Sequence, residues 1–197
     1  MSTAERLVAE YGLSAVSDRR IGEAAGQGDI GAVSRHFTGR TGLIRAILRR
    51  HGEQVDRIRE RHVAEAGDSQ DIRDWTGALV RPVAEHLASL GTPSWQARFA
   101  VQVMTDPLLR AMSIDEALVR ESLRRTLDGL GRCLTDVPAP VRAERGAMAR
   151  HLITHTCAER ERALASGAAP PRCWARTADA LTDAIVGLLT APVTPLR

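Results

Sequence analysis

Hydrophobic residues recur every three or four positions along most of the chain, as they do on the buried face of an amphipathic helix. The first such stripe lies in residues 3–11 and comprises Ala4, Leu7, Val8 and Tyr11. No stretch of the sequence alternates with the period of two that is typical of strands, and glycine, proline and capping residues separate the helical stripes. The pattern therefore predicts an all-α fold.

Two short helices joined by a glycine turn are predicted for residues 17–37. Ser17 is a good N-cap for the first helix, and Gly26 ends it because glycine readily adopts the left-handed backbone of a helix end. Asp29 is suited to cap the second helix, whose inner side ends at Phe37. This layout is that of a helix-turn-helix, in which the second helix enters the DNA major groove. The same layout also occurs in helical proteins that never contact DNA.

Two longer helices are predicted after this segment. Thr41 is expected to cap a helix that ends near Ala64, and Asp71 is expected to cap the next one. Pro82 lies inside that next helix and should kink it, because proline removes one backbone hydrogen bond. Gly91 marks its end.

Four further helices are predicted in the second half of the chain. One ends at Asp106-Pro107, one begins at a cap formed by Asp115, one spans residues 141–166, and the last begins near Cys173. The helix capped by Asp115 is expected to run through Leu134 with Val119 facing inward. The last helix carries apolar positions in steps of four and three, a seam typical of helix–helix packing: Trp174, Ala178, Leu181, Ile185 and Leu188.

The organisation that follows is a small unit of residues 1–50 and a larger helical unit of residues 51–197. The net charge is +3, and all 27 basic residues are arginine. Up to Arg50 the chain carries eight arginines against five acidic residues, whereas the remainder is nearly balanced. Arginine binds phosphate through a bidentate fork, so this distribution favours a nucleic-acid contact in the first unit.

Several function classes are excluded or not indicated by the sequence. No apolar run is long enough to span a bilayer and no signal-peptide pattern is found, so a cytoplasmic protein is expected. Cys133, Cys157 and Cys173 are widely separated and form no CxxC pair, so free thiols are expected. No nucleophile–base pair, phosphate-binding glycine loop or paired carboxylates indicate an enzyme, and no cofactor is indicated.

One set of residues has the spacing of a metal site. His151 and His155 lie four positions apart, which places them on one helix face, and Cys157 is close by. No carboxylate or third ligand falls on the same face. We therefore predict no metal site.

The N-terminal residues resemble a known family of regulators. The segments AERLVAEYGLSAVSDRRIGEAAG and GAVSRHFTGRTGLIRAIL, within residues 4–48, are similar to the DNA-binding unit of the tetracycline-repressor (TetR) family. The closest likeness is to a subgroup whose turn reads G-Q-x-x-x-x-A-V-x-x-H-F. Beyond residue 64 the similarity is limited to the helical layout and a short phrase near the C-terminus.

This resemblance implies a transcriptional regulator, in most cases a repressor. It implies a homodimer in which each subunit presents one helix-turn-helix to half of a palindromic DNA operator. Residues 1–50 would form the DNA-binding domain, and residues 51–197 the ligand-binding and dimerisation domain. A small-molecule effector would shift the long connecting helix and release the DNA.

The predicted DNA contacts fall into two groups. Ser17, Arg35, His36 and Arg40 are expected to contact phosphates, with Arg40 at the family's basic loop position. Base-edge contacts are expected from four residues of the turn and second helix: Gln27, Asp29, Gly31 and Ser34.

Two further sets of residues are assigned to the larger unit. The residues that could line an effector pocket are Trp75, Trp95, Phe99 and Met104. The residues expected at the dimer interface are Leu152, His155, Leu181, Ile185 and Leu188.

The turn departs from the subgroup. Gly28 and Gly31 replace an asparagine-rich turn, and Arg35 replaces an aromatic residue before the histidine. Glycines inside a helix weaken it by about 1 kcal/mol each. An alternative is therefore a helical homodimeric interaction protein whose degenerate helix-turn-helix binds DNA weakly.

Overall fold

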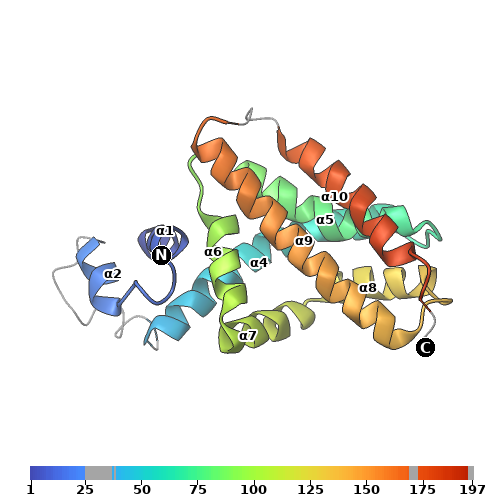
Figure 1. Ribbon diagram of the computed structural model, residues 1–197, viewed down its shortest axis with the longest axis horizontal. Helices are drawn as coiled ribbons and strands as arrows, with labels where there is room; N and C mark the ends of the chain where they lie inside the picture. Colours follow the sequence, from blue (N-terminus) through green and yellow to red (C-terminus); the bar gives the residue numbers. More distant parts are fainter. Residues whose placement is uncertain (25–36, 38, 169–172, 195–197) are drawn as a thin grey trace.

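The computed structural model describes residues 1–24, 37, 39–168 and 173–194. All regular secondary structure in these residues is helical, which confirms the all-α prediction (Figure 1). The described helices, in chain order, are α1 (Ser2–Tyr11), α2 (Asp18–Ala24), α4 (Gly39–Ala66), α5 (Ile72–Ser89), α6 (Gln96–Thr105), α7 (Pro107–Leu118), α8 (Glu121–Cys133), α9 (Ala139–Ala165) and α10 (Cys173–Thr190).

Local capping signals fix the ends of the first helices as predicted. Gly12 follows α1 with a φ of 82°, a conformation that favours glycine. The Ser17 hydroxyl accepts a hydrogen bond from the backbone N–H of Arg20 at 3.2 Å, so this N-cap is confirmed. Asp71 also caps as predicted, because its carboxylate accepts from the N–H of Arg73 at 2.8 Å. The second helix of the predicted helix-turn-helix lies outside the described residues except for Phe37.

Helix α4 is a single rod of 28 residues that begins at Gly39, two residues before the predicted cap. At 1.5 Å per residue it is about 42 Å long. Leu43 and Ile47 near its start pack in one hydrophobic core, whereas Val63 near its end packs in another. The boundary predicted at residue 50 therefore falls in the middle of one continuous helix.

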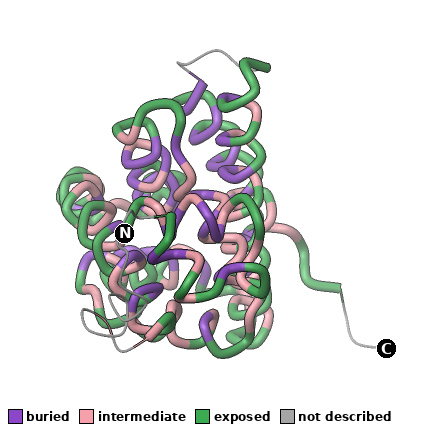
Figure 2. The backbone as a smooth tube through the Cα atoms, turned by 90° about the vertical axis from the view of Figure 1, so that its left-hand side faces the viewer, coloured by how far each residue is buried: buried purple, intermediate pink, exposed green. Residues whose placement is uncertain are grey.

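The smaller core joins the N-terminal helices to the rest of the protein. Ala4, Leu7 and Val8 of α1 pack there with α2 and the start of α4. Figure 2 shows that buried and exposed residues alternate along the helical turns, as they do in helices with one buried face. Phe99 and Val103 of α6 belong to the same core and are fully buried. The first unit is therefore packed against α6 and is more than a flexible appendage on α4.

The larger core is built from α5, α8, α9 and α10. Figure 1 shows α5, α9 and α10 side by side at the end of the molecule away from α1 and α2. The apolar seam predicted on α10 packs onto α5 of the same chain, with ion pairs Arg73–Asp183 and Arg81–Asp179 along its edge. Pro82 lies inside α5, which runs unbroken from residue 72 to residue 89.

The prediction of a helix that begins at Asp115 is wrong. Asp115 lies inside α7, which begins at Pro107 because the Asp106 carboxylate accepts from the N–H groups of Leu108 and Leu109 at 3.0 Å. The Asp-Pro pair thus both ends α6 and begins α7. The break between α7 and α8 falls at residues 119–120, so Val119, predicted to face inward, is 76% exposed.

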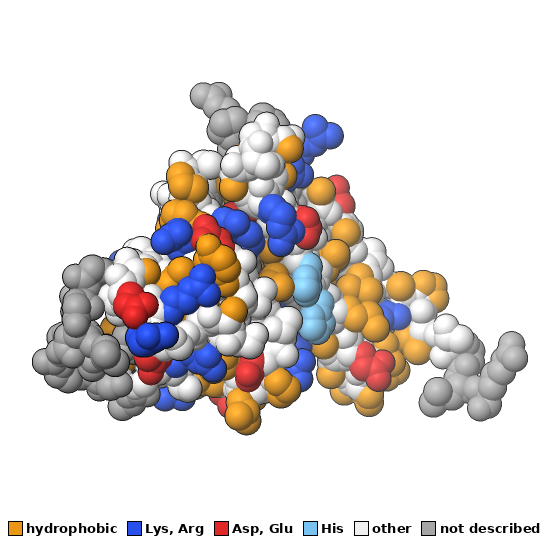
Figure 3. Space-filling view, turned by 60° about the vertical axis from the view of Figure 1, so that its left-hand side comes forward, with side chains coloured by type: hydrophobic (Ala, Val, Ile, Leu, Met, Phe, Trp, Pro, Cys, Tyr) orange, Lys and Arg blue, Asp and Glu red, His pale blue; other side chains and the backbone are white. Residues whose placement is uncertain are grey.

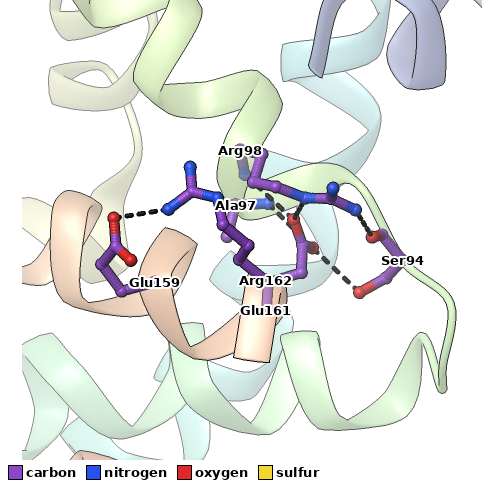
Figure 4. A network of polar contacts seen from close by, with 6 residues as sticks. All are labelled: Ser94, Ala97, Arg98, Glu159, Glu161 and Arg162. Atoms are coloured by element: carbon purple, nitrogen blue, oxygen red, sulfur yellow. Dashed lines mark hydrogen bonds and ion pairs between the residues drawn. The ribbon is translucent and has the colours of Figure 1, made fainter. Parts of the chain in front are cut away.

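A buried carboxylate fastens α9 to the start of α6 (Figure 4). Glu161 is 1% exposed and accepts four hydrogen bonds: from Ser94 Oγ at 2.9 Å, Ala97 N at 3.1 Å, Arg98 N at 3.0 Å and Arg98 Nε at 3.1 Å. Two of these donors are N-terminal amides of α6, whose own N-cap residue makes no side-chain cap. Glu161 therefore caps α6 from another helix, and the helix dipole favours its charge.

The larger core predicts opposite effects for two glycines of α8. A Cβ added at Gly129 overlaps the buried indole ring of Trp75, whereas a Cβ added at Gly131 meets nothing within 4 Å. We expect Gly129→Ala to lower the free energy of unfolding by about 3 kcal/mol through overpacking. Gly131→Ala should raise it by about 0.5–1 kcal/mol because alanine favours the helix. Urea unfolding measures both, and equal values for the two variants would contradict the packing.

Candidate functional site

The main candidate site is a cavity of about 340 Å³ in the middle of the protein. Its wall is formed by α4 to α9, with one residue of α10. Most of the lining is aliphatic: Val55, Leu79, Val83, Leu87, Ile114, Leu118, Leu123, Leu127, Leu130, Ile153 and Leu189. Leu118 and Leu127 are 43% and 40% exposed, so the cavity opens to solvent where α7 and α8 meet. Its size is that of a pocket for a small organic molecule.

A few polar side chains interrupt this aliphatic wall. They are Arg59, His86, Gln96, Arg150 and Thr154, and the described residues of the lining include no aspartate or glutamate. Within the described part of the chain, three of their buried atoms have no hydrogen-bond partner: Nε of Arg59, Oε1 of Gln96 and Nε of Arg150. Buried polar atoms are nearly always satisfied in folded proteins, so three orphans in one wall make this cavity the main candidate site.

Among the three residues with orphaned atoms, Arg59 is the most buried, with 6% of its surface exposed. The pKa of Arg59 is lowered from its ordinary value to about 10, mainly because burial disfavours the charged form. The charge of Asp56 partly offsets this effect, and the charge of Arg120 adds to it. The guanidinium is still protonated at neutral pH. The cavity therefore carries a buried positive charge in an otherwise apolar wall.

Cys157 also lies in the wall, but its thiol is unreactive. Burial, followed by the charge of Glu161, raises the pKa of Cys157 to about 12. The thiolate is the nucleophile and the metal ligand, so this cysteine performs neither role at neutral pH. No group of three or more His, Cys, Asp or Glu side chains suited to a metal ion is found among the residues that the structure places.

A chain of buried hydrogen bonds leads from the cavity wall to the N-terminal helix. His86 of α5 lines the cavity, and its Nε2 lies 2.8 Å from Nδ1 of His51 in α4. Nε2 of His51 lies 3.2 Å from Oε2 of Glu5 in α1. All three side chains are at most 6% exposed. A carboxylate only accepts, so His51 donates to Glu5, whereas the donor between the two histidines depends on their tautomers.

This Glu5–His51–His86 chain is not among the features predicted from the sequence. Its signal was a polar residue within the apolar face of each helix, which becomes informative only when the three helices are known to meet. Burial, then the charge of His51, lowers the pKa of His86 to about 4, and the charge of Glu5 raises it. His86 is therefore neutral at physiological pH.

The four predicted pocket residues are not in the wall of this cavity. Trp75 is part of the larger core and Phe99 is part of the smaller one. Trp95 and Met104 are half-buried on α6 and at its start, outside the lining. The wall is aliphatic because the large aromatic rings fill the cores between helices.

Of the predicted DNA contacts, Ser17 and Arg40 are described. Both are exposed, and Nη1 of Arg40 donates to the carbonyls of Leu13 at 2.9 Å and Val16 at 3.2 Å. Arg40 therefore holds the start of α4 against the α1–α2 connection. The other predicted contacts lie outside the described residues: Gln27, Asp29, Gly31, Ser34, Arg35 and His36.

The predicted dimer residues divide into two groups. Leu181 and Ile185 are buried inside the protein's own core, and Leu188 is half-buried against it. Leu152 and His155 are exposed on α9, beside Met148, which is 54% exposed. The rings of His151 and His155 stack with centroids 6.3 Å apart. Figure 3 shows histidine side chains on a face where hydrophobic side chains are also exposed.

The buried histidine makes stability depend on pH. His86 has an ordinary pKa of 6.5 when unfolded and about 4 when folded, so only the unfolded chain gains a proton between these values. We expect the protonation of His86 in the unfolded chain to lower the free energy of unfolding by about 3 kcal/mol as the pH drops from 6.5 to 4. In His86→Gln, whose amide still bonds to His51, urea unfolding should show a smaller fall. His151→Gln, on the surface, is the control; an unchanged fall in His86→Gln would contradict this role.

Arg59 should limit the stability of the ligand-free protein. Replacing this buried cation, whose Nε has no partner among the described residues, in Arg59→Met should raise the free energy of unfolding by about 1–3 kcal/mol. Arg57→Met, at an exposed position of the same helix, should change it by less than about 0.5 kcal/mol. Thermal and urea unfolding measure both variants. A loss of stability in Arg59→Met would show that the guanidinium is already paired.

Comparisons with known proteins do not identify a relative. No protein-family model matches the chain, and no curated protein or solved structure is significantly similar to it. No helix in the described ranges is both long and apolar enough to cross a membrane. The resemblance of residues 4–48 to the TetR family therefore stays a prediction, and the chain's own geometry has to support any function.

Proposed function

We propose that this protein is a ligand-responsive DNA-binding regulator of the TetR type, a homodimeric transcriptional repressor that a small molecule releases from its operator. The single observation that supports this most is the position of α4. Its first turns pack in the smaller core with α1 and α2, and its middle supplies Val55 and Arg59 to the cavity wall.

A rigid helix shared in this way converts occupancy of the cavity into movement of the N-terminal helices. A ligand that displaces Val55 or Arg59 changes the tilt of α4, and the rod carries that change over its length. The half-sites of a palindromic operator lie about 34–36 Å apart, so a dimer whose two N-terminal units shift by a few ångströms no longer fits both. The Glu5–His51–His86 chain provides a second connection, from the wall directly to α1.

The DNA contact is proposed from the resemblance and the charge of the first 50 residues. Arg40 is anchored by two backbone carbonyls, which preorganises its exposed guanidinium beside the α1–α2 connection. Preorganised arginine is well suited to a phosphate oxygen. Ser17 lies at the N-terminus of α2, where the helix dipole also favours a phosphate.

A second copy is proposed to pack on α9. Met148 and Leu152 are exposed there, beside the stacked pair His151 and His155. An exposed strip of this kind is typical of a protein contact, and two copies related by a twofold axis would cover it with the same strip.

The same strip supports the alternative of a helical homodimer that acts by protein contacts and binds DNA weakly. Gly28 and Gly31 in the predicted turn favour that alternative. Catalysis is not part of either proposal, since the wall pairs no activated nucleophile with a base.

Salt dependence of DNA binding separates the two proposals. Fluorescence anisotropy with the DNA upstream of the protein's own gene should give an affinity whose logarithm falls by about 0.9 per phosphate contacted for each unit of log salt. Arg40→Gln should weaken binding and reduce that slope by about 0.9 if it loses one phosphate.

The matched control is Arg57→Gln, an exposed arginine about 25 Å farther along α4. It should leave both affinity and slope unchanged. Binding that is equally weak for this DNA and for an unrelated sequence would contradict the regulator and favour the interaction protein.

A further inference from the structure

We propose that the ligand of the central cavity is an amphipathic anion, a carboxylate on an apolar body, whose charged group is held by Arg59 and Arg150. This names the effector class of the regulator proposed above, and its biological role rests on that proposal. The binding itself is a property of the cavity and is testable without DNA.

The charge of the wall sets the sign of the ligand. Two arginines line the cavity and no acidic side chain does. Asp56 lies near Arg59 on the same helix, but it accepts a hydrogen bond from Ser122 and its effect is opposed by Arg120. A buried cation without a full partner is costly, and an anion that enters the cavity removes that cost.

The orphaned atoms set the kind of contact. Nε of Arg59 and Nε of Arg150 are buried donors without an acceptor among the described residues. Elsewhere a buried arginine has acceptors within the protein: Arg145 donates to the carbonyls of Leu189 at 2.9 Å and Pro192 at 3.2 Å. The difference is that Arg59 and Arg150 face a cavity. A carboxylate presents two oxygens that match the fork of a guanidinium.

The amide of Gln96 adds a third polar contact. Its Oε1 is buried and accepts no hydrogen bond within the described residues. It can accept from a hydroxyl on the ligand, or it can turn over and present its NH₂ group to the anion. Either contact would orient the polar end of the ligand without requiring a second charge.

The rest of the wall requires an apolar body. Eleven aliphatic side chains of Val, Leu and Ile line the cavity, so a small free anion such as acetate leaves most of this surface uncovered. A cation would be repelled by both arginines, and an uncharged oil would leave Arg59 unpaired. Only a molecule with both parts satisfies the whole cavity.

Isothermal titration calorimetry on the full chain without DNA tests the proposal. The probes are decanoate, with a flexible body, and 2-naphthoate, with a flat one, and the matched uncharged probes are decanol and 2-naphthol. We expect at least one carboxylate to bind about 10-fold to 100-fold more tightly than its alcohol, the range for a charge-assisted hydrogen bond. Equal affinity for acid and alcohol, or no binding of either acid, would overturn the proposal.

Two variants assign the binding to the named residues. Arg59→Met and Arg150→Met should each weaken binding of the carboxylate about 10-fold or more while leaving the alcohol unchanged. Arg57→Met replaces an exposed arginine on the same helix and should bind the carboxylate as tightly as the original protein does. Carboxylate binding that survives in both variants would overturn the proposal.

A separate readout distinguishes failure of this inference from failure of the proposed function. If the carboxylate binds through Arg59 and Arg150 but does not change the affinity for operator DNA, the proposed ligand class is supported and the proposed ligand-responsive regulator is overturned. If the DNA is bound with the expected salt dependence and neither carboxylate binds in the cavity, the proposed DNA-binding function is supported and the proposed ligand class is overturned.

Discussion

The structure depends on helix α4, which contributes buried residues to both hydrophobic cores. Leu43 and Ile47 at the start of α4 pack in the smaller core, and Val63 near its end packs in the larger core. Because the interior of a protein is close-packed, neither core can shift α4 without disturbing the other. The cavity borders the stretch between these anchors, at Val55 and Arg59. A ligand there therefore acts on a helix that neither core can move alone.

Two buried ionic side chains, Glu161 and Arg59, differ in how far the protein satisfies them. Glu161 accepts four hydrogen bonds and joins α9 to α6, so its burial is fully compensated. Arg59 is almost as buried but keeps an orphaned Nε at the cavity wall. A group of the first kind stabilises the fold, whereas a group of the second kind is costly until a partner arrives. That contrast is what marks the cavity as a site and Glu161 as structural.

The sequence predicted the features that depend on near neighbours. The caps Ser17 and Asp71 and the helix-ending Gly91 act within a few residues, so their patterns are readable in one dimension. Asp115 was misassigned because Asp106, followed by proline, is the stronger start signal and because α7 and α8 are separated without a proline or glycine.

The cavity and the polar chain were not readable in the same way. Glu5, His51 and His86 are separated by 46 and 35 positions, so only the packing of α1, α4 and α5 brings them together. The residues predicted to line a pocket lie outside this cavity for a related reason: aromatic rings mark where apolar area is largest, and the fold uses Trp75 and Phe99 to fill its cores. The all-α class required no such long-range information.

Hydrogen–deuterium exchange with and without decanoate tests most directly whether the cavity and the N-terminal helices are coupled. Exchange should change in the wall helices and also in α1 and the first turns of α4, and His86→Gln should reduce the change in α1 while keeping that in the wall. A change confined to α5–α9, with α1 unaffected, would contradict the coupling through α4 and the buried histidines.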